Sequence, residues 1–179
     1  MKDLVRTWPQ TAAFLIASVA LAAPILPEAK SIPDEMRCLA GAKMVRVEFG
    51  EVPAALWKAG LRLADIKRQA RRQLRAEGFR IVQGTEAPKV IVGFRAMADD
   101  SVPDATGFTA FLEIRQAVRV LRLDDEMILP TTTVLSYGLK KNDEVAVACL
   151  DHLASVLDKL VFFVNIATRS QEAEKKEAE

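Results

Sequence analysis

The spacing of hydrophobic residues changes twice along this chain, and that change limits the fold more than any other feature. Residues 44–49 alternate between apolar and polar side chains, which predicts a half-buried strand. From Arg62 the apolar residues recur every three or four positions, which predicts an amphipathic helix that stops at Gly78. The recurring residues are Leu63, Ile66, Ala70 and Leu74. Residues 90–97 are then almost continuously apolar, which is typical of a central strand.

The second half of the chain predicts two more strands and one long helix. Residues 108–123 form a long third strand with alternating charged side chains. Residues 127–139 form a fourth strand, and Pro130 near its start is typical of an edge strand or a bulge. A helix with a broad apolar face over about five turns follows. The members of that face are Val145, Cys149, Leu153, Val156, Leu157, Leu160, Val161 and Val164.

These elements together predict an α+β two-layer sandwich in the order β-α-β-β-β-α. The first helix lets the first two strands lie parallel, and strands two to four then follow as an antiparallel meander. The result is a four-stranded mixed sheet with two helices on one face. The other face carries Glu113, Arg115 and Arg119, so we expect it to meet solvent or a partner.

The first residues indicate export. Lys2 and Arg6 precede a 13-residue uncharged stretch, which is too short for the roughly 20 residues of a membrane span. Ala20 and Ala22 form an A-x-A motif, so we expect a signal peptide cleaved after Ala22 and a secreted or periplasmic protein without a transmembrane span. An uncleaved anchor and a buried cytoplasmic helix are the alternatives. The expected divisions are a signal peptide (1–22), an extended leader (23–42), a single α+β domain (43–169) and a charged disordered tail (170–179).

Export would place the two cysteines of the chain in an oxidising compartment. In an oxidising compartment Cys38 and Cys149 can form one disulfide that closes a long loop. The alternative is that Cys149 is a small buried hydrophobic residue on a helix face and Cys38 is a loop thiol. The sequence does not say whether their Cα atoms lie within bridging distance.

Charge is balanced overall and concentrated locally. The chain has 25 Lys and Arg against 24 Asp and Glu; cleavage after Ala22 removes Lys2, Arg6 and Asp3, which leaves 23 of each. This balance argues against binding a nucleic acid through bulk charge. The first predicted helix is nevertheless rich in bases. Those that form a candidate interaction surface are Arg62, Lys67, Arg68, Arg71, Arg72 and Arg75.

Three interpretations of this basic helix compete. Its long side chains can form a solvated face that covers apolar surface and pairs with nearby acids. They can instead dock on anionic lipid or lipopolysaccharide, or on an acidic protein partner. Nucleic acid is the weakest interpretation, because the chain contains no recognition motif. The oligomeric state is open.

No pattern in the sequence supports catalysis or a cofactor. His152 is the single histidine, it falls in the middle of the last predicted helix, and no G-x-S-x-G turn accompanies it. Asp99, Asp100 and Asp104 do not have the spacing of a calcium loop and are typical turn residues. No G-x-x-x-x-G-K phosphate loop occurs. We therefore expect neither an enzyme nor a metal or cofactor site.

Several short motifs resemble a group of uncharacterised exported bacterial proteins. They are the stretch from Ala70 to Val82, the Pro88-led strand, the stretch from Phe111 to Val118, the threonines 131–133 and the ending from Leu157 to Asn165. The resemblance covers roughly residues 43–166, and it departs at Val134 and Ile166, where the group often has Trp and Pro. It implies no activity. In outline the expected fold is also similar to the small α+β domains of envelope assembly factors.

The leading hypothesis is an exported, non-enzymatic domain that binds a protein or an envelope component. The alternative is a periplasmic carrier of lipid or another small ligand in an apolar gap between sheet and helices. A cavity above roughly 300 Å³ would favour the carrier. An uncovered apolar patch on the outer sheet face would favour a partner, and a polar cleft joining His152 to carboxylates would favour an enzyme.

Overall fold

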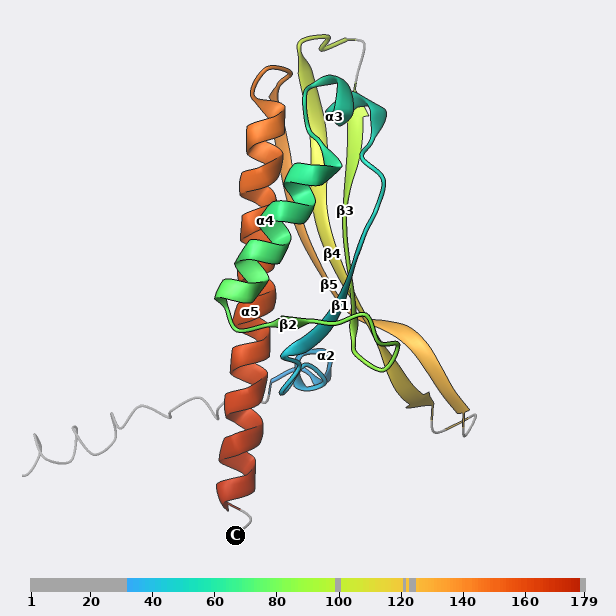
Figure 1. The fold of residues 1–179 in the computed structure, drawn as a ribbon, viewed down its shortest axis with the longest axis vertical. Helices are drawn as coiled ribbons and strands as arrows, with labels where there is room; N and C mark the ends of the chain where they lie inside the picture. Colours follow the sequence, from blue (N-terminus) through green and yellow to red (C-terminus); the bar gives the residue numbers. More distant parts are fainter. Residues whose placement is uncertain (1–31, 99–100, 121, 123–124, 178–179) are drawn as a thin grey trace, which may run out of the picture. The chain divides into compact units, whose positions relative to one another are not determined.

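The computed structural model describes residues 32–98, 101–120, 122 and 125–177 (Figure 1). The predicted signal peptide and the first part of the predicted leader lie outside these residues, as do Asp99 and Asp100. The described chain forms one compact unit that begins at Ile32. Its α+β class is the predicted one.

A five-stranded mixed sheet forms one layer, in the order β2-β1-β3-β4-β5. The strands are β1 (Met44–Phe49), β2 (Arg80–Ile81), β3 (Lys89–Ala98), β4 (Ala105–Val120) and β5 (Asp125–Lys141). β1 pairs parallel with β3, and β3, β4 and β5 pair antiparallel, as predicted. β3 is therefore the central strand.

The prediction of four strands is wrong, because β2 adds a fifth beside β1. The Arg80 amide donates to the Lys43 carbonyl at 2.8 Å, and the Val82 amide donates to the Val45 carbonyl at 3.0 Å. A strand of two residues is too short to produce a period in the sequence.

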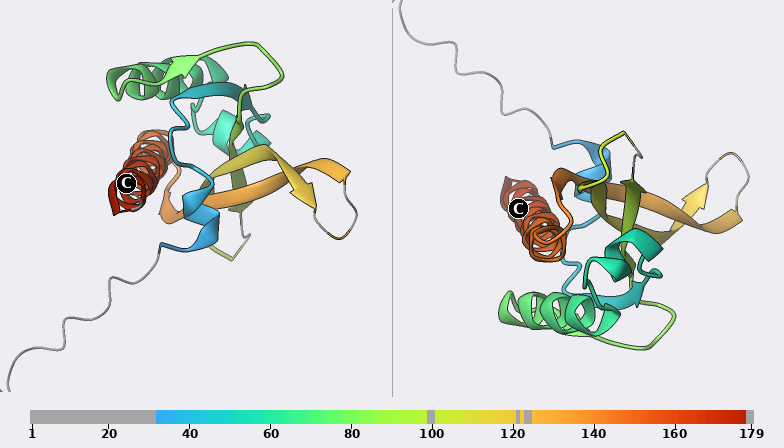
Figure 2. Two further views of the ribbon diagram at one scale, coloured as in Figure 1. Left: turned by 90° about the horizontal axis from the view of Figure 1, so that it is seen from below. Right: turned by 90° about the horizontal axis from the view of Figure 1, so that it is seen from above.

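Two long helices, α4 (Leu63–Ala76) and α5 (Val145–Glu177), form the second layer. Figure 2 shows both on the same side of the sheet. α5 packs on β4 and β5, and α4 packs on α5 and contacts β2. All eight residues of the predicted apolar face of the last helix are at most 8% exposed. The helical period therefore predicted correctly which side of this helix faces the core.

Gly78 ends helix α4 and turns the chain back toward the core. Gly78 has φ +80°, a left-handed conformation that favours glycine. The Gly78 amide donates to the Arg75 carbonyl at 3.1 Å, and the Phe79 amide donates to the Leu74 carbonyl at 2.9 Å. This is a Schellman motif, and it returns Phe79 to the core at 3% exposure.

Three segments differ from expectation. Part of the predicted leader forms the short helix α2 (Asp34–Arg37), and Leu39 after it is completely buried. Residues 54–58, for which no helix was predicted, form the helix α3 (Ala54–Lys58), which buries Leu56. α5 continues to Glu177, so residues 170–177 are helical where a disordered tail was predicted; the Arg37 guanidinium donates to both Glu174 carboxylate oxygens at 2.8 Å.

β5 lies at the edge of the sheet and is irregular beside Pro130, as predicted. Ile114 is opposite Thr132 and Arg115 is opposite Pro130, so Thr131 is an extra residue. β3 begins opposite Arg115. β4 and β5 continue past that point as a two-stranded ribbon that bends away from the sheet (Figure 1).

Candidate functional site

The basic surface is built on the side of α4 that faces away from the core. Ile66, Ala70 and Leu74 occupy the buried side. Gln69 and Gln73 flank them, and their amides donate to the α5 carbonyls of Leu150 and Ala154 at 2.7 and 3.1 Å. With these contacts fixing the rotation of α4, the remaining positions point into solvent. Arg62, Arg68, Arg71, Arg72 and Arg75 are exposed and Lys67 is half-buried.

Acidic neighbours neutralise little of this surface. Arg68 pairs with Asp65 at 2.5 Å, one turn earlier. Lys67 and Arg71 lie over the Phe49 ring, at 5.9 and 6.0 Å from its centroid. Among the described residues, no ion pair is seen for the other five bases of the surface. The structure thus gathers all six predicted residues on one face with most of their charge uncompensated.

An exposed tryptophan extends the basic surface at its N-terminal end. The Arg62 guanidinium lies 4.7 Å from the centroid of the Trp57 ring and donates to the Trp57 carbonyl at 2.5 Å. Trp57 remains 56% exposed, although it follows the fully buried Leu56 in α3. The sequence pattern did not predict that α3 turns the indole outward beside the arginines.

The outer face of the sheet is polar on one half. Glu48 lies between Lys89 and Arg46, with carboxylate–nitrogen distances of 2.6 and 3.7 Å. The hydrogen bond from Lys89 is the main reason that the pKa of Glu48 lies below its usual value. Glu113 and Arg115 pair on the same half at 2.5 Å. This half matches the predicted solvent-facing surface.

Among the described residues, the other half of that face carries exposed apolar side chains together with Arg95, whose guanidinium lies 5.6 Å from the centroid of the Phe111 ring. Met97 is 76% exposed, Leu135 41%, and Tyr137 and Leu139 68% each. A period of two is visible at 135, 137 and 139 in the sequence. The prediction of a polar outer face used the charged residues of β4 alone. The pairing of β4 with β5 shows that Leu135, Tyr137 and Leu139 lie on the same face as those charged residues.

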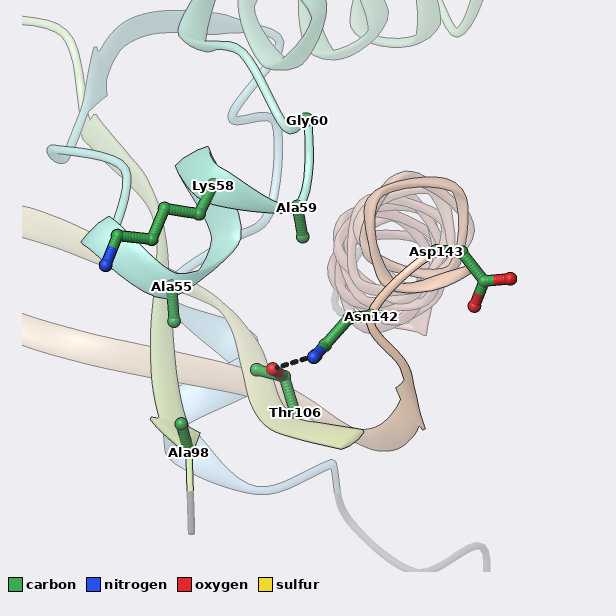
Figure 3. Close-up of a pocket in the computed structure, with 8 residues that line it drawn as sticks. All are labelled: Ala55, Lys58, Ala59, Gly60, Ala98, Thr106, Asn142 and Asp143. Carbon is green, nitrogen blue, oxygen red and sulfur yellow. Dashed lines mark hydrogen bonds between the residues drawn. The ribbon is translucent and has the colours of Figure 1, made fainter. Parts of the chain in front are cut away.

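A pocket of about 660 Å³ lies at one end of the layers (Figure 3). Ala55, Ala59 and Ala98 line its apolar part, and Lys58 and Asp143 lie at its exposed rim. Thr106 and Asn142 share a side-chain hydrogen bond of 2.7 Å in it (Figure 3). The pocket exceeds the expected size for a carrier, but the carrier hypothesis placed the cavity between sheet and helices. That space is filled by the core, including the fully buried Leu112, Leu153 and Leu157.

His152 packs between the layers. Its Nδ1 lies 2.8 Å from the Ser136 hydroxyl, and its ring meets the Phe108 ring edge-on at 5.0 Å. The described pockets do not include His152 among their lining residues.

Cys38 and Cys149, which the sequence left open as a disulfide pair or as separate thiols, are not bridged to each other in the structure; Cys38 is exposed and Cys149 is buried. Cys38 belongs to the segment that contacts the C-terminal half of α5, where the Gly41 amide donates to the Thr168 hydroxyl at 3.0 Å. Thr168 lies about 28 Å along the helix axis from Cys149, at 1.5 Å per residue. A disulfide requires Cα atoms within about 7 Å. Burial raises the pKa of Cys149 to about 12.

The described residues contain no group of three His, Cys, Asp or Glu side chains arranged to hold a metal ion. Asp104 is exposed near the start of β4. In the described part of the chain, no helix is both long and apolar enough to span a membrane.

Comparisons with known proteins do not assign a family. No family model and no curated protein matches the chain. Among solved structures, rare lipoprotein B from Shewanella oneidensis is similar at a TM-score of 0.40 with 12% identity, covering 73% of this chain and 98% of that one. A minor lipoprotein from Acinetobacter baumannii is similar at a TM-score of 0.32 with 18% identity, covering 76% and 95%. Likeness at these TM-scores carries no conclusion about function.

Proposed function

We propose that this protein is an exported, non-enzymatic domain that binds an anionic lipid surface of the cell envelope through the basic surface of α4. The observation that carries the proposal is the row of six bases along α4, five of them exposed and Lys67 half-buried, of which Arg68 alone pairs with a described acid. The signal-peptide pattern of residues 1–22 supports an envelope location.

The distribution of charge favours electrostatic binding through the basic surface alone. Each Lys or Arg near an anionic membrane contributes about 1 kcal/mol. The chain after the predicted cleavage has no net charge, so attraction must come from the basic surface and not from the molecule as a whole. Such attraction extends only about 8 Å at physiological ionic strength. Binding should therefore require direct contact and weaken with salt.

Trp57 favours a lipid surface over an acidic protein as the partner. Tryptophan prefers the boundary between water and lipid because its ring is apolar and its N–H is polar. Here the indole is 56% exposed and adjoins Arg62. The apolar side of α4 is occupied by the core, so the helix itself does not insert. Docking would place α4 flat on the headgroups with Trp57 as its apolar contact.

Vesicle co-sedimentation tests this proposal with a matched pair of variants. One variant changes Arg68, Arg71 and Arg72 to Glu, and the control changes the same three residues to Lys. The protein should bind phosphatidylglycerol vesicles and not phosphatidylcholine vesicles. Loss of three bases at about 1 kcal/mol each weakens binding roughly a hundred-fold, and the Lys variant should bind like the natural protein.

Either of two outcomes contradicts the lipid proposal. One is that the natural protein does not bind anionic vesicles; the other is that the Glu variant binds them equally well. If the natural protein ignores vesicles but binds an acidic protein that the Glu variant does not bind, the basic surface serves a protein partner instead.

The small-ligand carrier is the second candidate, and the pocket of about 660 Å³ is the observation that favours it. Small side chains at Ala55, Ala59 and Ala98 leave this space open. It ranks second because the pocket is at the end of the layers and has charged residues at its rim. Binding of a fluorescent fatty acid that Ala59→Trp abolishes would support it.

A further inference from the structure

A small pocket opens within the basic surface, where α4 packs on α5. Its volume is about 180 Å³, and it is lined by Asp65, Arg68, Gln69 and Arg72 of α4 and by Leu150 of α5. Each of the four α4 residues is three or four positions from two of the others, so all four share one side of the helix. The row of bases is therefore not uniform, because two of its arginines border a pocket.

The wall of this pocket between the two helices is fixed by a hydrogen bond. The Gln69 amide donates to the Leu150 carbonyl at 2.7 Å, which joins α4 to α5 at this point. The Leu150 side chain is partly buried and packs against the hydrophobic core. A site whose walls are already held in place loses less conformational freedom when a ligand binds.

Both arginines of the pocket have N–H groups available to a ligand. Arg68 pairs with Asp65 at 2.5 Å, yet its side chain is 73% exposed. Arg72 is exposed, and within the described part of the chain no acid pairs with it. A guanidinium carries several N–H donors in a fixed plane, so one contact with a carboxylate oxygen leaves others free. Such donors form strong, charge-assisted hydrogen bonds with phosphate oxygens.

We propose that this pocket binds the headgroup of a single phosphatidylglycerol molecule. The inference rests on the proposed lipid binding and adds a specific site to it. Arg68 and Arg72 donate to the phosphate oxygens, and Asp65 accepts a hydrogen bond from a glycerol hydroxyl. Leu150 supplies an apolar contact for the carbon atoms of the glycerol.

The charge of the pocket favours a phosphodiester with a hydroxylated headgroup. Two arginines and one aspartate give the lining a net charge of +1, which balances the single negative charge of a phosphodiester. A phosphomonoester carries a charge of about −1.5 to −2 at pH 7. It also has no hydroxyl to donate to Asp65, whose carboxylate would repel it.

The size of the pocket favours a headgroup over a whole lipid. Sites that enclose a complete small molecule usually have volumes of roughly 300–1,000 Å³. At about 180 Å³ this pocket is smaller, so the acyl chains would stay in the membrane. This agrees with a helix that lies on the headgroups, because its apolar side is already occupied by the core.

A titration with a soluble lipid, followed by NMR, tests the site. Dihexanoyl phosphatidylglycerol, kept below its micelle concentration, should shift the Leu150 methyl signals in a saturable way. Arg72→Gln should weaken this binding about ten-fold or more, the loss expected for a hydrogen bond to a charged group. Arg75→Gln is the matched control, because it removes the same charge from an exposed residue of α4 that does not line the pocket. It should change the affinity by less than about two-fold, since salt screens an exposed charge outside the pocket.

The choice of ligand separates a headgroup site from simple charge attraction. Inorganic phosphate and dihexanoyl phosphatidic acid should bind more weakly than the phosphatidylglycerol, although phosphatidic acid carries more charge. The assignment to a glycerol headgroup is overturned if either of them binds equally well.

The proposal of a pocket is overturned if the Leu150 signals do not move, or if Arg72→Gln and Arg75→Gln weaken binding equally. If phosphatidylglycerol vesicles still capture the natural protein in that case, the lipid proposal stands and binding is spread over the basic surface. If the vesicles do not capture it, the lipid proposal itself is wrong.

Discussion

The two cysteines differ in chemistry because one is at the surface and the other is in the core. Cys38 is exposed and Cys149 is completely buried against the sheet. Burial disfavours the charged thiolate, which raises the pKa of Cys149 to about 12. Since the thiolate is the reactive form, Cys149 should be inert in the folded protein.

A thiol titration follows from this difference. With Ellman's reagent at pH 8, the native protein should release one equivalent of chromophore, from Cys38. Unfolding in guanidinium should expose Cys149 and give two equivalents. Cys38→Ser should reduce the native value to zero. A native value of zero in the unaltered protein, restored to two by a reductant, would mean that the disulfide forms and that this geometry is wrong.

Two glycines in the strands leave room for aromatic rings. A Cβ atom at Gly138 would collide with the ring of Phe108 on the facing position of β4, and one at Gly93 would collide with Phe111. Phe108 is 4% exposed and contacts His152, so its ring has little room to move. Gly138 is therefore required by packing and not by its backbone angles.

Gly138→Ala should destabilise the protein by about 1–3 kcal/mol, the range typical of an overfilled core. Gly84→Ala is the control, since no atom lies within 4 Å of a Cβ at that position. Urea unfolding monitored by circular dichroism measures both. Equal stabilities for the two variants would show that Phe108 moves aside freely.

Among the elements, those with a sustained hydrophobic period were predictable and those fixed by single contacts were not. The period of three and four residues placed Ile66, Ala70 and Leu74 in the core, and Gly78 marked the end of α4. β2 depends on two backbone hydrogen bonds to the β1 region. Such pairing is long-range and leaves no local signal. The last turns of α5 lack core residues in the sequence, yet the contact of Arg37 with Glu174 links them to α2.

The same distinction applies to the candidate surfaces. The basic surface was predictable, because helical spacing that directs Leu74 inward directs Arg71, Arg72 and Arg75 outward. The exposed apolar side chains on the outer sheet face were not predictable, because they come from β3 and β5. Their common side depends on register, such as Phe111 opposite both Gly93 and Leu135. The Asn142 side chain donates to the Pro103 carbonyl at 3.1 Å, and helix α5 begins after Glu144.

For the molecule as a whole, the two layers carry different surfaces. The helical layer presents bases and an indole, and the outer face of the sheet presents exposed apolar side chains of β3 and β5. With no net charge after the predicted cleavage, the protein has no long-range attraction to a polyanion. The proposed function therefore depends on whether α4 and Trp57 contact an anionic surface.

The fluorescence of Trp57 reports on that contact. After the predicted cleavage it is the one tryptophan of the chain, because the other, Trp8, lies in the predicted signal peptide. Adding phosphatidylglycerol vesicles to the mature protein should shift the emission to shorter wavelength as the indole leaves water. Added salt should reverse the shift, and phosphatidylcholine vesicles should cause none. An emission spectrum that stays unchanged with anionic vesicles at low salt would contradict the proposed role of α4.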